Sequence, residues 1–135
     1  MRPDIWIEWG RHDLHAAQAC MDKGEHHIAC YLAAQGAEKS LKAVMEHVGK
    51  AVPGTQALVT LREQLAAAGC RLDLSERVLR TLTRYATDAL QPPADSDCMP
   101  GELYGADDAR DALASAQRVY DTCHSAIAAT PGGDR

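Results

Sequence analysis

The chain has 135 residues, of which 46% are hydrophobic and 24% charged, with a formal net charge of −5. This size suits one compact domain that needs no disulfide or metal to hold it together, and the apolar content excludes a disordered chain. No apolar run approaches the roughly 18 residues that cross a membrane, and the first residues lack the apolar core of a signal peptide. We therefore expect one cytoplasmic domain over residues 1–130 and a disordered tail over 131–135.

The composition favours helices. The chain has 24 alanines, the best helix former, against six aromatic residues and no phenylalanine. Strands favour aromatic and β-branched residues, which are scarce here. The five cysteines have no CxxC spacing, so we expect reduced thiols rather than a disulfide framework.

Helix start and stop residues divide the chain into helices. The predicted helices span residues 3–23, 25–48, 56–68, 76–89 and 106–129. Gly24, Gly49 and Gly69 should end the first three helices, and Thr55 and Ser75 should cap the third and the fourth. Apolar positions cover more than half of the circumference of the second helix, which should therefore be central. Residues 91–105, rich in proline and aspartate, should form a long loop. We predict an all-α, antiparallel up-and-down bundle of four long helices plus one short helix.

Histidine and cysteine positions raise the question of a metal site. Glu8, His12 and His15 share one face of the first helix, and His26 lies one turn before Cys30. Zinc needs three or four converging ligands, and neither cluster carries an HExxH motif. We expect no metal site and no cofactor.

The charge distribution is more informative. Arg77, Arg80 and Arg84 lie within about 60° of one another on the predicted fourth helix, and residues 95–111 then carry six acids against one base. Clustered guanidinium groups suit phosphate, because each can donate two parallel hydrogen bonds. The same arginines could instead pair with the nearby acids or with a partner subunit.

Other motifs are either ordinary or missing. Glu38 and Lys42 have the favourable order for an i, i+4 ion pair, which is ordinarily a surface bridge. The chain has no GxGxxG, no Walker loop and no GxSxG elbow. Dinucleotide-binding and nucleophilic-serine sites can therefore be set aside.

The order of motifs along the chain is distinctive. Trp9 with Asp13-Leu14 precedes the run Gln35-Gly36-Ala37-Glu38-Lys39-Ser40-Leu41-Lys42, and then come Pro53-Gly54-Thr55, Thr83-Arg84-Tyr85, a proline-rich loop and Tyr104. From about Ile5 to Ile127 this order resembles the HEPN family. The resemblance implies an antiparallel helical bundle, a homodimer and, in many members, a minimal nucleotidyltransferase partner in toxin–antitoxin or nucleotide-handling systems.

The resemblance also implies a chemistry to test. Many members are metal-independent ribonucleases whose arginine is followed four to six residues later by a histidine, with the site assembled across a dimer. The arginine steadies the phosphate while the histidine moves a proton from the ribose 2′-hydroxyl. Arg84 matches that arginine by position, but residues 89–91 are alanine, leucine and glutamine. The other fitting pair, Arg118 and His124, would lie about 120° apart on one helix.

Three hypotheses follow from these observations. The leading one is a protein without membrane attachment that binds nucleotide or RNA phosphate and acts with a nucleotidyltransferase partner in a system of the toxin–antitoxin type. Its expected binding residues are Arg77, Arg80, Arg84, Tyr85, Tyr104, Glu38 and Lys42, with the tyrosines against a base. The alternatives are a metal-independent endoribonuclease toxin, with catalytic candidates Arg84, Arg118 and His124, and a structural homodimerisation module.

Overall fold

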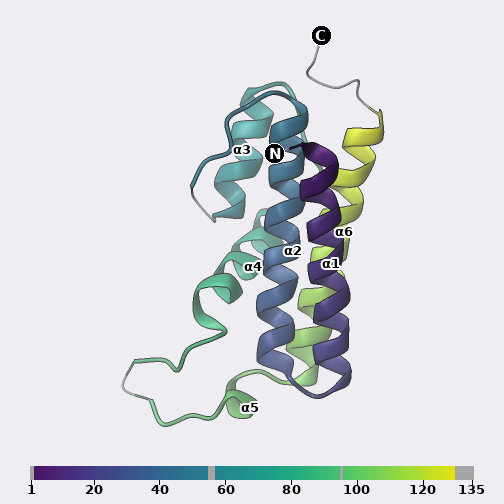
Figure 1. The fold of residues 1–135 in the computed structure, drawn as a ribbon. Coiled ribbons are helices and arrows are strands. Elements are labelled where there is room, and N and C mark those ends of the chain that lie inside the picture. Colours follow the sequence, from purple (N-terminus) through teal and green to yellow (C-terminus); the bar gives the residue numbers. More distant parts are fainter. Residues whose placement is uncertain (1, 55–56, 95, 130–135) are drawn as a thin grey trace.

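The computed structural model describes residues 2–54, 57–94 and 96–129, and these form helices and loops without any strand. The helices are α1 (Pro3–Asp22), α2 (His26–His47), α3 (Leu58–Ala67), α4 (Glu76–Asp88), α5 (Pro100–Leu103) and α6 (Ala106–Ala129) (Figure 1). The all-α prediction is confirmed. The predicted tail over residues 131–135 lies outside the described part of the chain.

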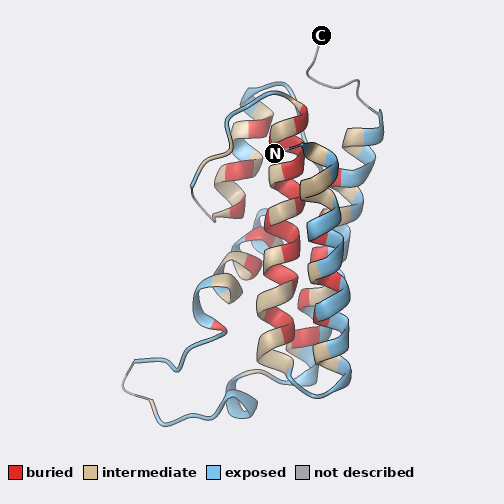
Figure 2. Ribbon diagram, viewed as in Figure 1, coloured by how far each residue is buried: buried red, intermediate tan, exposed pale blue. Residues whose placement is uncertain are grey.

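The three longest helices form the body of the molecule. α1 and α6 pack against α2 and against each other, while α3 and α4 follow one another along a different side of α2 (Figure 1). α2 touches every other described helix, as predicted from its wide apolar arc. Buried residues accordingly run along the whole length of α2, and on the surrounding helices they lie on the sides turned towards it (Figure 2).

Most helix ends lie close to the predicted positions, because local residues set them. Gly24, Gly49 and Gly69 adopt φ values of 81°, 78° and 91° just after α1, α2 and α3, a conformation that glycine takes at little cost. The Ser75 side chain accepts a hydrogen bond from the Val78 N–H at 3.3 Å and caps α4. The predicted Thr55 cap falls outside the described residues.

The segment between α4 and α6 holds one element that was not predicted. Within the expected loop over residues 91–105, Pro100 opens the four-residue helix α5. The Met99 N–H donates to the Glu102 carboxylate at 2.8 Å, which closes this single turn. The turn carries Leu103 and Tyr104 back towards the end of α4.

The helices of the described chain include no candidate for a membrane-spanning segment.

Candidate functional site

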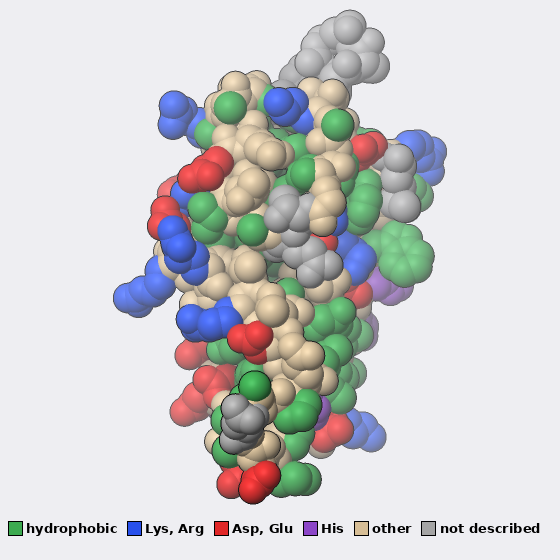
Figure 3. All heavy atoms as spheres, turned by 90° about the vertical axis from the view of Figure 1, so that its left-hand side faces the viewer, with side chains coloured by type: hydrophobic (Ala, Val, Ile, Leu, Met, Phe, Trp, Pro, Cys, Tyr) green, Lys and Arg blue, Asp and Glu red, His purple; other side chains and the backbone are tan. Residues whose placement is uncertain are grey.

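A cavity of about 440 Å³ opens where α4 ends and the following loop turns back. α4 contributes Arg84, Tyr85 and Asp88, and Tyr104 closes the opposite side just after α5. Figure 3 shows the side of the molecule that carries this segment. Lysine and arginine side chains gather at mid-height along the left edge of that view, and hydrophobic and acidic side chains lie at its lower end. The cavity therefore combines one cation, one acid and two phenols.

Arg84 is the cation of this cavity. Its side chain is exposed and forms neither an ion pair nor a hydrogen bond with any described residue, although Asp88 lines the same cavity one turn further on. An exposed guanidinium without an acidic partner keeps its planar set of donors for a ligand. Phosphate and carboxylate groups both accept two parallel N–H donors from one guanidinium, so Arg84 suits an oxyanion of this kind.

The two tyrosines form one wall of the cavity. The rings of Tyr85 and Tyr104 pack edge to face, with 6.1 Å between centroids and 62° between planes. Burial raises the pKa of both phenols, and the carboxylate of Asp108 raises it further. Both hydroxyls therefore stay protonated at neutral pH and can donate a hydrogen bond to an anion.

The other arginines of the predicted stripe lie elsewhere. Arg80 Nη2 lies 2.7 Å from Glu76 Oε2, so this guanidinium has an acidic partner on its own helix. Arg77 lines a separate groove of about 330 Å³ between α4 and α6, where it lies with Asp111. The structure therefore brings only Arg84, of the three arginines, into the cavity with the tyrosines.

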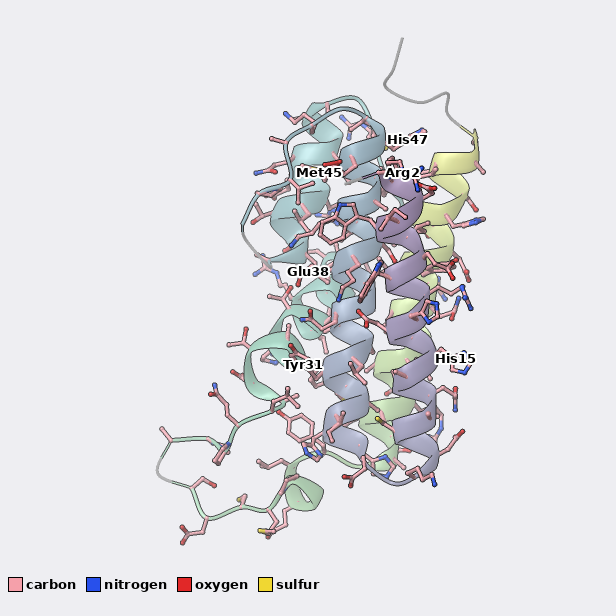
Figure 4. The ribbon with its side chains drawn as sticks, viewed as in Figure 1. Arg2, His15, Tyr31, Glu38, Met45 and His47 are labelled. Atoms are coloured by element: carbon pink, nitrogen blue, oxygen red, sulfur yellow. The ribbon has the colours of Figure 1, made fainter. Side chains whose placement is uncertain are left out.

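Glu38 and Lys42 do not line this cavity either. Their side chains form a 2.6 Å ion pair but are only 7% and 12% exposed, so the expectation of a surface bridge is wrong. The reason is that α1 covers this face of α2. The Lys42 ammonium lies 5.6 Å from the centre of the Trp6 ring, and Lys39 pairs with Asp13 at 2.6 Å alongside. Figure 4 marks Glu38 at mid-height on α2.

Arg118 and His124 are not brought together. Both lie on α6, but the His124 ring stacks on Tyr120, with 5.7 Å between centroids. Arg118 lines a different groove, against residues 73–75 in the turn that precedes α4. Within one chain the two side chains therefore have different described neighbours, Tyr120 for His124 and residues 73–75 for Arg118.

The structure also places a histidine that the sequence analysis did not single out. His27, in the first turn of α2, lines a second cavity of about 250 Å³ that lies beside the Arg84 cavity. Gln91, Pro92, Leu103 and Tyr104 line both cavities. Because His27 is some sixty residues before this loop, only the folded path of the loop brings them together, and no local sequence signal could have shown it.

The remaining titratable groups offer little chemistry. Among residues 2–54, 57–94 and 96–129, no three histidine, cysteine or acidic side chains lie close enough to hold a metal ion. Glu8 pairs instead with Arg11 at 2.6 Å and contacts His12 at 3.3 Å. Burial raises the pKa of the Cys30 thiol to about 12 and also raises that of Cys123, so neither thiol is a nucleophile at neutral pH.

Fold and cavity together define a small helical bundle with a surface cavity around Arg84, which has no acidic partner in the described part of the chain. A family model described as the HEPN domain matches residues 4–126, and the chain therefore belongs to the HEPN family. The resemblance noted in the sequence is thus confirmed. Comparison with curated proteins gives no match.

Solved structures show the same fold. The chain is similar to TT1696 from Thermus thermophilus, with 25% identity, a TM-score of 0.78, and coverage of 93% of this chain and 98% of that one. It is also similar to ST0689, an archaeal HEPN homologue (22% identity, TM-score 0.72, coverage 94% and 98%). A third is an HEPN domain protein, tm0613, from Thermotoga maritima (19% identity, TM-score 0.71, coverage 93% and 98%).

Proposed function

We propose that this HEPN protein binds the phosphate of a nucleotide or of RNA in the cavity around Arg84. The observation that carries the proposal is the exposed Arg84 guanidinium, which has no acidic partner among the described residues and lies beside two protonated tyrosine hydroxyls. The guanidinium supplies two parallel donors to the phosphate oxygens. The phenols add neutral donors and an aromatic surface.

Replacing Arg84 by alanine is expected to weaken the binding of AMP and of a short single-stranded RNA about tenfold or more, because hydrogen bonds to charged groups are each worth roughly 1.5–3 kcal/mol. Isothermal titration calorimetry at low salt measures the change. Binding should also weaken as salt rises, since phosphate contacts release counterions.

Arg80 provides the matched control for this substitution. It lies one turn before Arg84 on the same helix, but it pairs with Glu76 and lies outside the cavity. Arg80→Ala should therefore leave both affinities nearly unchanged. Equal losses in the two variants would contradict a specific role for Arg84, and no affinity of the unaltered protein for either ligand would reject the proposal.

Replacing Asp88 by asparagine is expected to strengthen the binding of inorganic phosphate about fivefold. Asp88 lines the Arg84 cavity, and two unit charges 4 Å apart interact by about 1 kcal/mol in water. The same calorimetric titration measures this gain. Asp121→Asn, on α6 and outside the cavity, should change nothing. An unchanged affinity in Asp88→Asn would place the phosphate elsewhere.

The proposal includes a homodimer and a minimal nucleotidyltransferase partner in a system of the toxin–antitoxin type. This part rests on membership of the HEPN family. Light scattering coupled to gel filtration tests the homodimer directly. Incubation of RNA with the protein in EDTA tests the ribonuclease alternative: cleavage lost in Arg84→Ala would favour it, and cleavage lost in His124→Ala would move the site to α6.

A further inference from the structure

The cavity beside Arg84 has a character of its own. It is lined by His27, by Leu90 just after α4 and by residues 98–100 before and within α5, and it shares four residues with the Arg84 cavity. No aspartate, glutamate, lysine or arginine of the described chain lines it. The two cavities therefore adjoin, one with a cation and an acid, the other without either.

Exposed apolar side chains concentrate at this second cavity. Within the described part of the chain four large hydrophobic side chains are exposed, and Leu90 (53%), Met99 (67%) and Leu103 (40%) all line it. Single exposed apolar residues are ordinary, but a group of them around a cavity marks a binding site. The fourth, Trp9, lies on α1 outside both cavities.

A few polar groups interrupt the apolar wall. His27 and Tyr104 can each donate or accept a hydrogen bond. The side-chain NH₂ of Gln91 donates to the Thr87 carbonyl at 3.2 Å, which leaves its side-chain oxygen as an acceptor. A ligand suited to these walls is uncharged, has apolar faces and carries polar atoms along its edge. A nucleobase meets all three requirements.

We propose that the base of a nucleoside phosphate occupies the His27 cavity while its phosphate lies at Arg84. The inference rests on the proposed function and extends it, because it assigns the base a place that the tyrosine pair alone does not provide. Tyr104 belongs to both cavities, so its ring separates the phosphate from the base. A free nucleotide and a nucleotide within an RNA strand present this same chemistry.

The experiment compares AMP with ribose 5-phosphate, which carries the same phosphate without a base. By calorimetry at low salt, AMP should bind about tenfold more tightly, a difference of about 1.4 kcal/mol, because only AMP places a base against the walls of the His27 cavity. In the double variant Leu90→Ser with Met99→Ser this preference should fall below about threefold, while the affinity for ribose 5-phosphate stays the same. Both side chains are exposed, so their replacement spares the core.

Trp9→Ser is the matched control, because it removes an exposed hydrophobic side chain outside the cavity and should keep the preference. If both ligands bind equally and Arg84→Ala weakens both, phosphate binding stands and the base cavity is rejected. If neither binds, both proposals fail. A short oligoadenylate shows whether the ligand is RNA or a free nucleotide. If the oligoadenylate binds more tightly than AMP and the double variant loses this binding, the ligand is RNA. If it binds more weakly than AMP, the ligand is a free nucleotide.

Discussion

Replacing Lys42 by methionine is expected to lower the free energy of unfolding by about 3–5 kcal/mol, because it removes the partner of a buried carboxylate. Glu38 accepts from Lys42 at 2.6 Å, and its second oxygen is buried with no other partner among the described residues. Methionine retains most of the apolar stem of Lys42 and removes only the ammonium, which lies over the Trp6 ring, so the loss reports the charge rather than the volume. Urea unfolding followed by circular dichroism measures the change.

Two further variants distinguish the stability cost of an unpaired buried charge from the cost of breaking an exposed ion pair. Adding Glu38→Leu to Lys42→Met removes both charges and should recover most of the lost stability, since a buried ion pair can be exchanged for apolar groups at little cost. Arg80→Met breaks the Glu76–Arg80 pair, which has the same i, i+4 spacing but is exposed, and should cost less than about 1 kcal/mol. If Lys42→Met and Arg80→Met lower the free energy of unfolding equally, water reaches the Glu38 carboxylate and the prediction is contradicted.

The limits of the helices could be predicted because they depend on neighbouring residues. The glycine stops after α1, α2 and α3 and the Ser75 cap of α4 each act within one turn of the chain. The central position of α2 also followed from the sequence, since a helix apolar on most of its circumference must be covered on several sides. Among the described helices only α5 was missed, a single turn in a segment that proline made look irregular.

The site could be predicted less well than the helices, and Lys42 illustrates the reason. Spacing shows that Glu38 and Lys42 can pair, but it does not show that α1 will cover them. The arginine stripe has the same limitation: helical spacing puts three arginines on one face, while tertiary contacts leave only Arg84 in the cavity with the tyrosines. His27 joins the site through the path of a loop, which no periodicity encodes.

Replacing Gly36 by valine is expected to destabilise the protein by about 1–3 kcal/mol or more, because α1 and α2 cross where neither has a side chain. A Cβ at Gly36 would lie 2.8 Å from Leu14 Cδ2 and 3.0 Å from the Gly10 carbonyl oxygen. The leucine could turn aside, but the backbone oxygen moves only if the two helices separate. Valine adds two further carbons at this point, and urea unfolding measures the loss.

Gly10 and Gly101 test whether this loss comes from the helix crossing. A Cβ at Gly10 would meet the Gly36 carbonyl oxygen and the Ser40 Oγ, each at 3.0 Å, so Gly10→Val should destabilise the same contact from the opposite helix. A Cβ at Gly101, in α5, meets nothing within 4 Å, so Gly101→Ala should leave stability unchanged or slightly raised. Because Gly36→Val and Gly10→Val disturb one crossing, their effects should not add, and a double variant with additive losses would contradict a shared contact.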